Sequence, residues 1–203
     1  MIRSRILSRL SRSVSQAAMA LRDDARATAA VETALILPVA MTMFALLVYG
    51  AEAFAIQRKV TLTARTVTDL ITQSTPTMVG GHPSVAQSSI DTDLGVSSSV
   101  LTPYTAANLS MLATEVLVNA DQVTATVQWS EPYNGATARA TGSTLTLPTG
   151  LGTGQQGNYF ILGEAFYNYT PMNFFFPLSA MTLHDAIYLT PRQAPSLAML
   201  VGQ

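Results

Sequence analysis

The sequence predicts an α+β protein in which a long N-terminal helix, with a membrane half and an amphipathic half, packs on a small antiparallel β-sheet head. Three observations predict this class. Residues 34–51 carry no charge, no Asn and no Gln. Residues 52–73 place apolar side chains at intervals of three and four, which is typical of a half-buried helix. From Leu109 onward, apolar and polar residues alternate in short runs, which is typical of half-buried strands.

The apolar run has the length of a membrane-spanning helix. It covers 18 residues (34–51) and becomes longer when Thr33 and residues 54–56 are counted. The hydrocarbon core of a bilayer requires roughly 20 mainly apolar residues at about 1.5 Å of rise each. A core helix of a soluble protein is the alternative, but such helices usually have polar positions along one face. The run therefore predicts a membrane span.

The charges on the two sides of this run predict its orientation. From residue 33 onward, five basic residues face nine acidic ones. Residues 1–27 form a basic leader, whose Arg- and Ser-rich composition also allows an organellar transit peptide as an alternative. The arginines ahead of the run are Arg3, Arg5, Arg9, Arg12, Arg22 and Arg26. The positive-inside rule therefore places the leader in the cytoplasm, beside anionic membrane lipid, and the C-terminal domain across the membrane.

A secretory signal peptide is a rival interpretation of the same segment. Ala53-Phe54-Ala55 fits the small-x-small pattern of signal peptidase sites, so a cut after Ala55 would release a soluble domain. The apolar run is longer than the usual core of a signal peptide, which has 7 to 15 residues, and the segment before it is also unusually long. Both features favour the membrane span.

The segment Ala27 to Pro38, ATAAVETALILP, resembles the class III signal of TadE-like pseudopilins, components of the tight-adherence (Flp, type IVc) pilus apparatus. The resemblance implies a pilin-like fold and a cut by a prepilin peptidase between Ala27 and Thr28, where family members commonly have Gly before the cut. It also implies a single-pass protein of the bacterial inner membrane with a periplasmic head, which can enter the pilus. The implied partners are the peptidase, other pilin or pseudopilin subunits and inner-membrane pilus assembly proteins. Residues 167–171 and 187–192 are similar to family patterns more loosely.

Glu32 stands at the N-terminal end of the apolar run, and two explanations are open. A carboxylate at the edge of hydrocarbon needs a positive partner, and a cut after Ala27 would create an α-amine on Thr28, four residues upstream. The resemblance implies that this Glu pairs with the N-terminal amine of a neighbouring subunit during assembly. Alternatively, Glu32 only interacts with the positive end of the helix dipole.

The rest of the chain divides by its pattern. We expect the membrane helix and its extension over residues 28–75, a loop region with at most a short helix over 76–105, and a β-rich head over 106–203. The predicted hairpin has its turn at Ala120-Asp121, and another turn is expected at residues 132–135. The expected strands are residues 111–119, 122–130, 139–147, 158–169, 173–178 and 183–189.

Motifs that suggest catalysis or cofactors fit poorly here. Residues 152–157 match G-x-G-x-x-G, but an expected strand follows where a dinucleotide site needs a helix. His184-Asp185 lacks a nucleophile elbow, and two histidines without cysteine make a poor metal site. We therefore expect no enzyme activity, no cofactor and no metal. Nucleic-acid binding is disfavoured because residues 28–203 carry ten acidic and five basic groups.

Phe174, Phe175 and Phe176 form the candidate contact patch of the head, because three consecutive aromatic residues in a strand cannot all point inward. Three functions remain open. The first is a minor pilin or pseudopilin that supports pilus biogenesis and adhesion. The second is an unprocessed, membrane-anchored protein that binds another component of the envelope. The third is a soluble domain released after Ala55.

Overall fold

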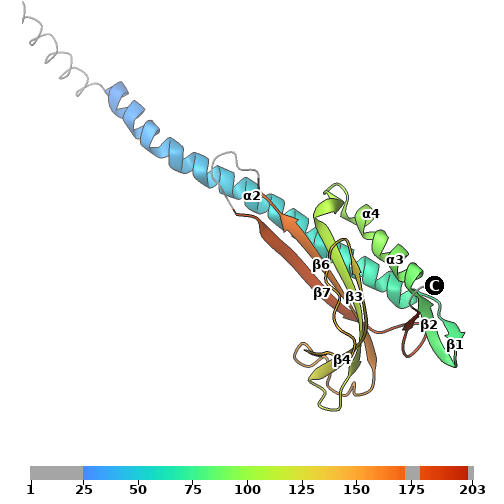
Figure 1. Cartoon of the computed structure of the whole chain (residues 1–203). Helices are drawn as coiled ribbons and strands as arrows, with labels where there is room; N and C mark the ends of the chain where they lie inside the picture. Colours follow the sequence, from blue (N-terminus) through green and yellow to red (C-terminus); the bar gives the residue numbers. More distant parts are fainter. Residues whose placement is uncertain (1–24, 172–178, 201–203) are drawn as a thin grey trace, which may run out of the picture. The chain divides into compact units, whose positions relative to one another are not determined.

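A computed structural model describes residues 25–171 and 179–200, with side chains from residue 28 on (Figure 1). The chain divides into two compact units, Met1–Gly50 and Ala51–Gln203. The described part of the first unit is helical, and the second unit contains the β-sheet. The architecture is mixed α+β, as the sequence predicts.

Helix α2, Ala25–Gln73, contains 49 residues and includes the whole apolar run. Within the second unit, its buried residues recur every three or four positions, which places them on one face. These residues are Ile56, Val60, Ala64, Val67 and Ile71, the set that the sequence pattern predicts. Residues 51–73 thus form the amphipathic half of the helix, and this half packs on the sheet.

The main sheet has five antiparallel strands in the order β5-β4-β3-β6-β7. The strands are β3 (Leu109–Val118), β4 (Thr124–Tyr133), β5 (Thr144–Thr146), β6 (Tyr159–Tyr169) and β7 (Met181–Leu189). The central strand β3 is buried along almost its whole length, and the outer strand β7 is largely exposed or half-buried. In Figure 1, β6 and β7 lie nearest to α2, and β4 curls away from the helix.

The sheet supports two separate hydrophobic clusters, and the adjacent residues Phe160 and Ile161 of β6 belong to different ones. In the pairing of β3 with β4, a β-bulge separates the residues of the two clusters. The register shifts between Glu115 and Val116, so Glu115 pairs with Trp129 and Val116 pairs with Val127. Trp129 belongs to a first cluster, which includes the buried face of α2, and Val127 belongs to a second cluster around Phe160. The second cluster consists of Val116, Val118, Ala125, Val127, Leu147 and Phe160. It contains no residue of α2.

Helix α2 lies very close to the sheet at Gly163 of β6. A Cβ atom added at Gly163 would lie 1.7 Å from Oγ1 and 2.9 Å from Cβ of Thr68. Thr68 is fully buried, and its hydroxyl donates a hydrogen bond to the Ala64 carbonyl at 2.6 Å. Only glycine therefore allows the helix to lie this close to the strand.

Residues 76–105 are not the loop region that their sequence pattern predicts. They form two strands and two helices: β1 (Thr77–Val79), β2 (His82–Ala86), α3 (Gln87–Gly95) and α4 (Ser97–Leu101). Ile90, Leu94 and Leu101 are buried and extend the cluster beside α2. Many of the remaining side chains are Ser, Thr and Asp, which have low helix propensity, so burial of the three apolar side chains stabilises these short helices. A short 3-10 helix, Ala106–Asn108, leads into β3.

A second, three-stranded sheet pairs a strand near the C-terminus with the segment that follows α2. Strand β8, Ala198–Leu200, pairs in parallel with β2, which pairs in the antiparallel direction with β1. Leu197, just before β8, is held from both sides. Its N–H donates to the Glu115 carboxylate at 2.6 Å, and its carbonyl accepts from the Trp129 indole at 2.6 Å.

Two of the expected strand boundaries are wrong. Residues 132 and 133 belong to β4, and the turn is at Asn134 and Gly135, where both φ angles are positive. The expected strand 139–147 is reduced to β5 at residues 144–146, because much of that stretch crosses the sheet as irregular chain. The expected strand 173–178 lies outside the described residues.

Side-chain hydrogen bonds protect the outer edge of β7. Gln57 of α2 donates to the His184 carbonyl at 3.1 Å, and the Asp185 carboxylate accepts from the N–H of Ala186 at 2.9 Å. Residues 184 and 186 are two apart, so these backbone groups point to the same side of the strand. Edge strands with free backbone groups tend to pair with other chains, and these two bonds occupy part of that edge.

Candidate functional site

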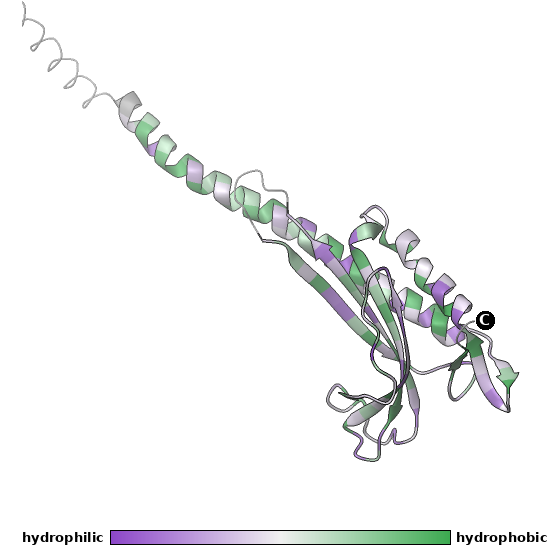
Figure 2. Ribbon diagram, in the orientation of Figure 1, coloured by the Kyte–Doolittle hydropathy of each residue, from purple (hydrophilic) through white to green (hydrophobic). Residues whose placement is uncertain are grey.

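The apolar half of α2 exposes almost all of its large side chains. Leu35 and Leu47 are 71% and 70% exposed, and green, hydrophobic colour runs along the upper part of the helix in Figure 2. The other exposed large side chains are Val31, Ile36, Leu37, Val39, Met41, Met43, Phe44, Leu46 and Val48. This is the one helix of the described residues that is long and apolar enough to cross a membrane, although a signal sequence would pass the same test.

The polar groups within this half bond to the helix itself. The Thr33 hydroxyl donates to the Ala29 carbonyl at 2.8 Å, and the Thr42 hydroxyl donates to the Pro38 carbonyl at 2.7 Å. Such bonds to the preceding turn satisfy hydroxyls without water. The threonines therefore present little unpaired polarity to an apolar environment.

The predicted processing residues Ala27 and Thr28 lie in the described N-terminal part of α2, ahead of the apolar run. Glu32 follows Thr28 by four residues, so the two lie on the same face. Glu32 is exposed, and no described residue forms an ion pair with it.

The C-terminal border connects α2 to the sheet of the second unit. The Tyr169 hydroxyl at the end of β6 donates a hydrogen bond to the Glu52 carboxylate at 2.9 Å. Ala53 packs against the first cluster, and Ile56 is only 2% exposed. The head therefore begins to contact the helix within a few residues of Gly50.

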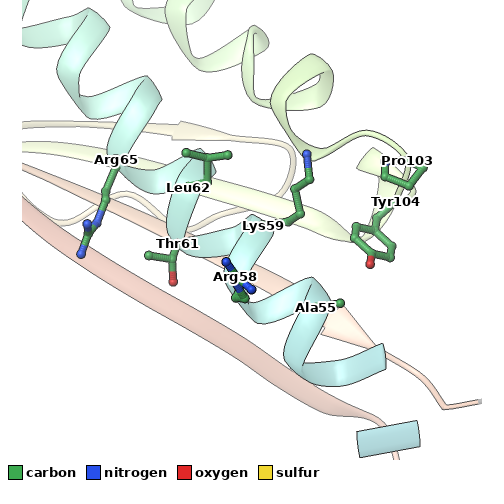
Figure 3. A pocket seen from close by; sticks show the side chains of 8 residues that line it. All are labelled: Ala55, Arg58, Lys59, Thr61, Leu62, Arg65, Pro103 and Tyr104. Carbon is green, nitrogen blue, oxygen red and sulfur yellow. The ribbon is translucent and has the colours of Figure 1, made fainter. Parts of the chain in front are cut away.

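Polar residues of the second unit also gather beside the exposed face of α2. A groove of about 580 Å³ lies between α2 and residues 103–104, and Figure 3 shows its lining side chains. Arg58, Lys59 and Arg65 line it, and the Lys59 ammonium donates to the Val100 carbonyl at 3.3 Å. Sequence reasoning noted these cations only as the polar side of the helix. Their common groove depends on residues 103–104, which are distant in the sequence.

Three buried carboxylates in the sheet have different environments. Burial raises the pKa of Glu115 to about 7, against the opposing effect of hydrogen bonds from Leu197 and Trp129. Burial also raises the pKa of Glu131, which accepts a hydrogen bond from Gln87. Sequence reasoning missed these groups because a carboxylate in a strand does not reveal its partner.

The third carboxylate, Glu164, forms two hydrogen bonds with the Arg139 guanidinium, which raises the pKa of Arg139. His184 stacks on Phe166 with ring centroids 4.4 Å apart, and its Nε2 lies 3.7 Å from Glu164. His184 thus contacts the ion pair, and its neighbour Asp185 bonds the edge of β7. This arrangement is an ion pair within the sheet.

The glycine-rich motif at 152–157 is a set of turns that leads into a strand. The next element is β6, which begins at Tyr159, where a dinucleotide fingerprint needs a helix. The backbone of Gly152 lies against Gln122, whose carbonyl would be 2.2 Å from an added Cβ. In the described part of the chain, no group of three or more His, Cys, Asp or Glu side chains could hold a metal ion.

Phe174, Phe175 and Phe176, the candidate contact patch, lie outside the described residues. Comparison with protein-family models, with curated proteins and with solved structures finds no match to this chain. The apolar helix and its two borders are therefore the observations on which a function rests.

Proposed function

We propose that the chain is a TadE-like minor pilin or pseudopilin of a tight-adherence pilus, anchored in the bacterial inner membrane and assembled through its N-terminal helix. In this role it supports pilus biogenesis and adhesion. The observation that carries the proposal is that one helix, α2, has two unlike halves. Its first half exposes large apolar side chains, and its second half is buried against the head.

The exposed half of α2 needs an apolar environment. Burial of one large apolar side chain is worth about 1.5–3 kcal/mol, and 11 such side chains between Val31 and Val48 are exposed. Contiguous apolar surface of this kind marks membrane or protein contact. Lipid would cover the helix before assembly, and the helices of neighbouring subunits would cover it afterwards.

The N-terminal border suits processing between Ala27 and Thr28. Six residues separate this bond from Ala34, so a cut there leaves the apolar run intact. The new α-amine would stand four residues before Glu32 and would provide the positive partner that a carboxylate at the hydrocarbon edge needs.

Release of a soluble domain after Ala55 is the weaker alternative. The cut would place a charged α-amine on Ile56, which is only 2% exposed. Burial of an unpaired charge is costly. The cut would also remove Glu52, which bonds Tyr169, and Ala53, which packs on the first cluster.

N-terminal sequencing of the protein from its native cell envelope distinguishes the three functions. We expect Thr28 as the first residue. A start at Met1 would favour the unprocessed envelope-binding protein, and a start at Ile56 would refute the pilin proposal.

Glu32→Ala tests the ion pair independently of processing. We expect the variant to enter the membrane normally but to form markedly fewer pili, because the N-terminal amine of a neighbour would lose its partner. Glu52→Gln is the matched control, since it removes the acid at the other border while an amide oxygen can still accept from Tyr169. Normal piliation of Glu32→Ala would show that the ion pair has no role in assembly.

A further inference from the structure

Among the described residues, three cations of the second unit form no ion pair with an acidic side chain. Five basic residues follow position 33. Arg139 pairs with Glu164, and Arg192 pairs with Asp69 of α2. The other three, Arg58, Lys59 and Arg65, all line the groove beside α2, and no Asp or Glu lines it. Like charges held together on one surface favour an anionic ligand.

The groove is lined by three cations and by apolar side chains. Figure 3 shows Arg58, Lys59 and Arg65 pointing in different directions from α2, with Pro103 and Tyr104 across from Ala55. Leu62, within the groove, is 49% exposed, and Phe54, one turn before Arg58, is 67% exposed. The bond from Lys59 to the Val100 carbonyl holds the ammonium toward α4. Charged groups that diverge in this way match a surface of several anions better than a single small anion.

We infer that this groove binds the headgroup phosphate of anionic phospholipid in the leaflet on the same side as the head. The inference rests on the membrane placement under Proposed function. Guanidinium groups bind phosphate oxygens through paired N–H donors, which suits Arg58, the arginine of the groove nearest to the apolar run. Phe54 and Leu62 provide apolar surface for the lipid beside its phosphate, and Tyr104 is of the amphipathic aromatic type found at membrane interfaces.

The position along α2 favours lipid over an acidic protein segment. Arg58 follows the last residue of the apolar run by seven residues, about 10 Å of helix. The interfacial layer on each side of the hydrocarbon is roughly 5–8 Å thick, so a flexible arginine at Arg58 can reach the phosphates. Basic residues are normally depleted on the far side of a membrane, so three cations close together on this side suggest a local anion.

A melting experiment on the full chain in zwitterionic detergent tests the site. Trp129, the only tryptophan, is buried in the first cluster, so its fluorescence reports unfolding of the head. Short-chain phosphatidylglycerol should raise the melting temperature in a saturable way, because a ligand that binds only the folded state stabilises it. Phosphatidylcholine and inorganic phosphate at the same concentrations should leave it unchanged.

Variants then locate the binding residues. Arg58→Gln should weaken the apparent affinity for phosphatidylglycerol about fivefold, the effect of about one charge at an anionic surface. Arg65→Gln should weaken it less, since Arg65 lies seven residues further from the apolar run. Arg192→Gln is the matched control, because it removes an exposed arginine that pairs with Asp69 outside the groove. It should bind lipid like the wild type.

Several results would overturn the inference. An equal rise with phosphatidylcholine would remove the role of charge, and an equal rise with inorganic phosphate would indicate a general anion site. Wild-type affinity in Arg58→Gln would place lipid binding elsewhere. A larger rise with a polyglutamate peptide would make an acidic protein segment the occupant. These outcomes are independent of N-terminal sequencing, so a chain that starts at Thr28 without lipid preference refutes the lipid site alone.

Discussion

The contact between Gly163 and Thr68 predicts that the head depends on α2 for its stability. In Gly163→Ala, the new Cβ would lie 1.7 Å from the Thr68 hydroxyl oxygen and 2.9 Å from its Cβ. Thr68 cannot move away easily, because it is fully buried and β-branched side chains in helices have few rotamers. The helix must therefore shift away from β6, or the threonine must change its conformation.

The expected cost combines two effects. Overpacking of a well-packed core costs about 1–3 kcal/mol. Loss of the hydrogen bond from Thr68 to the Ala64 carbonyl adds about 1 kcal/mol. A total of about 2–4 kcal/mol would lower the melting temperature by roughly 5–15 °C for a chain of this size. Trp129 fluorescence of the full chain in detergent measures this change, as for the lipid site.

A double-mutant cycle separates the clash from other effects of the alanine. Thr68→Ala keeps the Cβ of residue 68 but removes its hydroxyl oxygen and its methyl group, which would lie close to the new Cβ of residue 163. The double variant should therefore be less destabilised than the sum of the single variants by about 1–2 kcal/mol. Gly95→Ala in α3 is the control, because an added Cβ there meets no atom within 4 Å. Wild-type melting of Gly163→Ala, or a double variant whose effects simply add, would refute the close contact.

Two further predictions concern the buried Glu115 and the edge of β7. Because burial raises the pKa of Glu115 to about 7, the folded state holds its proton more tightly than the unfolded state, so stability should fall as pH rises from about 4.5 to 7. In Glu115→Gln, this pH-dependent part of the free energy of unfolding, up to about 3 kcal/mol, should be absent. Unfolding measured across that pH range checks this, and a variant with the same pH profile as the wild type would contradict it. The double variant Gln57→Ala/Asp185→Ala should free the bonded backbone groups at the β7 edge and should promote self-association in sedimentation experiments. A variant that stays as monomeric as the wild type would show that these two bonds do not protect the edge.

The sequence predicts the parts of the fold that have strong periodicity. The buried face of α2 from Ile56 to Ile71 and the alternation in β3, β4 and β6 all come from local patterns that burial imposes. The two helices within residues 76–105 also have a partial helical pattern in the sequence, which our prediction of a loop region overlooked. Ile90, Leu94 and Leu101 follow helical spacing, but the polar residues between them hide it.

Other features had no local signal. The parallel pairing of β2 with β8 joins residues more than 100 positions apart, and nothing in either three- to five-residue strand specifies its partner. The β-bulge at Glu115 is equally hidden, although it decides which face of β4 each later residue occupies. At the candidate site, Ala27, Thr28 and Glu32 could be identified from their spacing. The groove at Arg58 could not, because two of its lining residues, Pro103 and Tyr104, are distant from α2 in the sequence.

The two hydrophobic clusters give the head two mechanically distinct parts. In a fibre held together by N-terminal helices, tension on the head would enter through α2. The load would pass first into the cluster that contains Val60, Val67 and Trp129, because the helix contributes to that cluster alone. The cluster around Phe160 and Val127 lies outside this path. A subunit under strain would therefore yield first along its helix, while the far end of the sheet keeps its shape and the surfaces it presents.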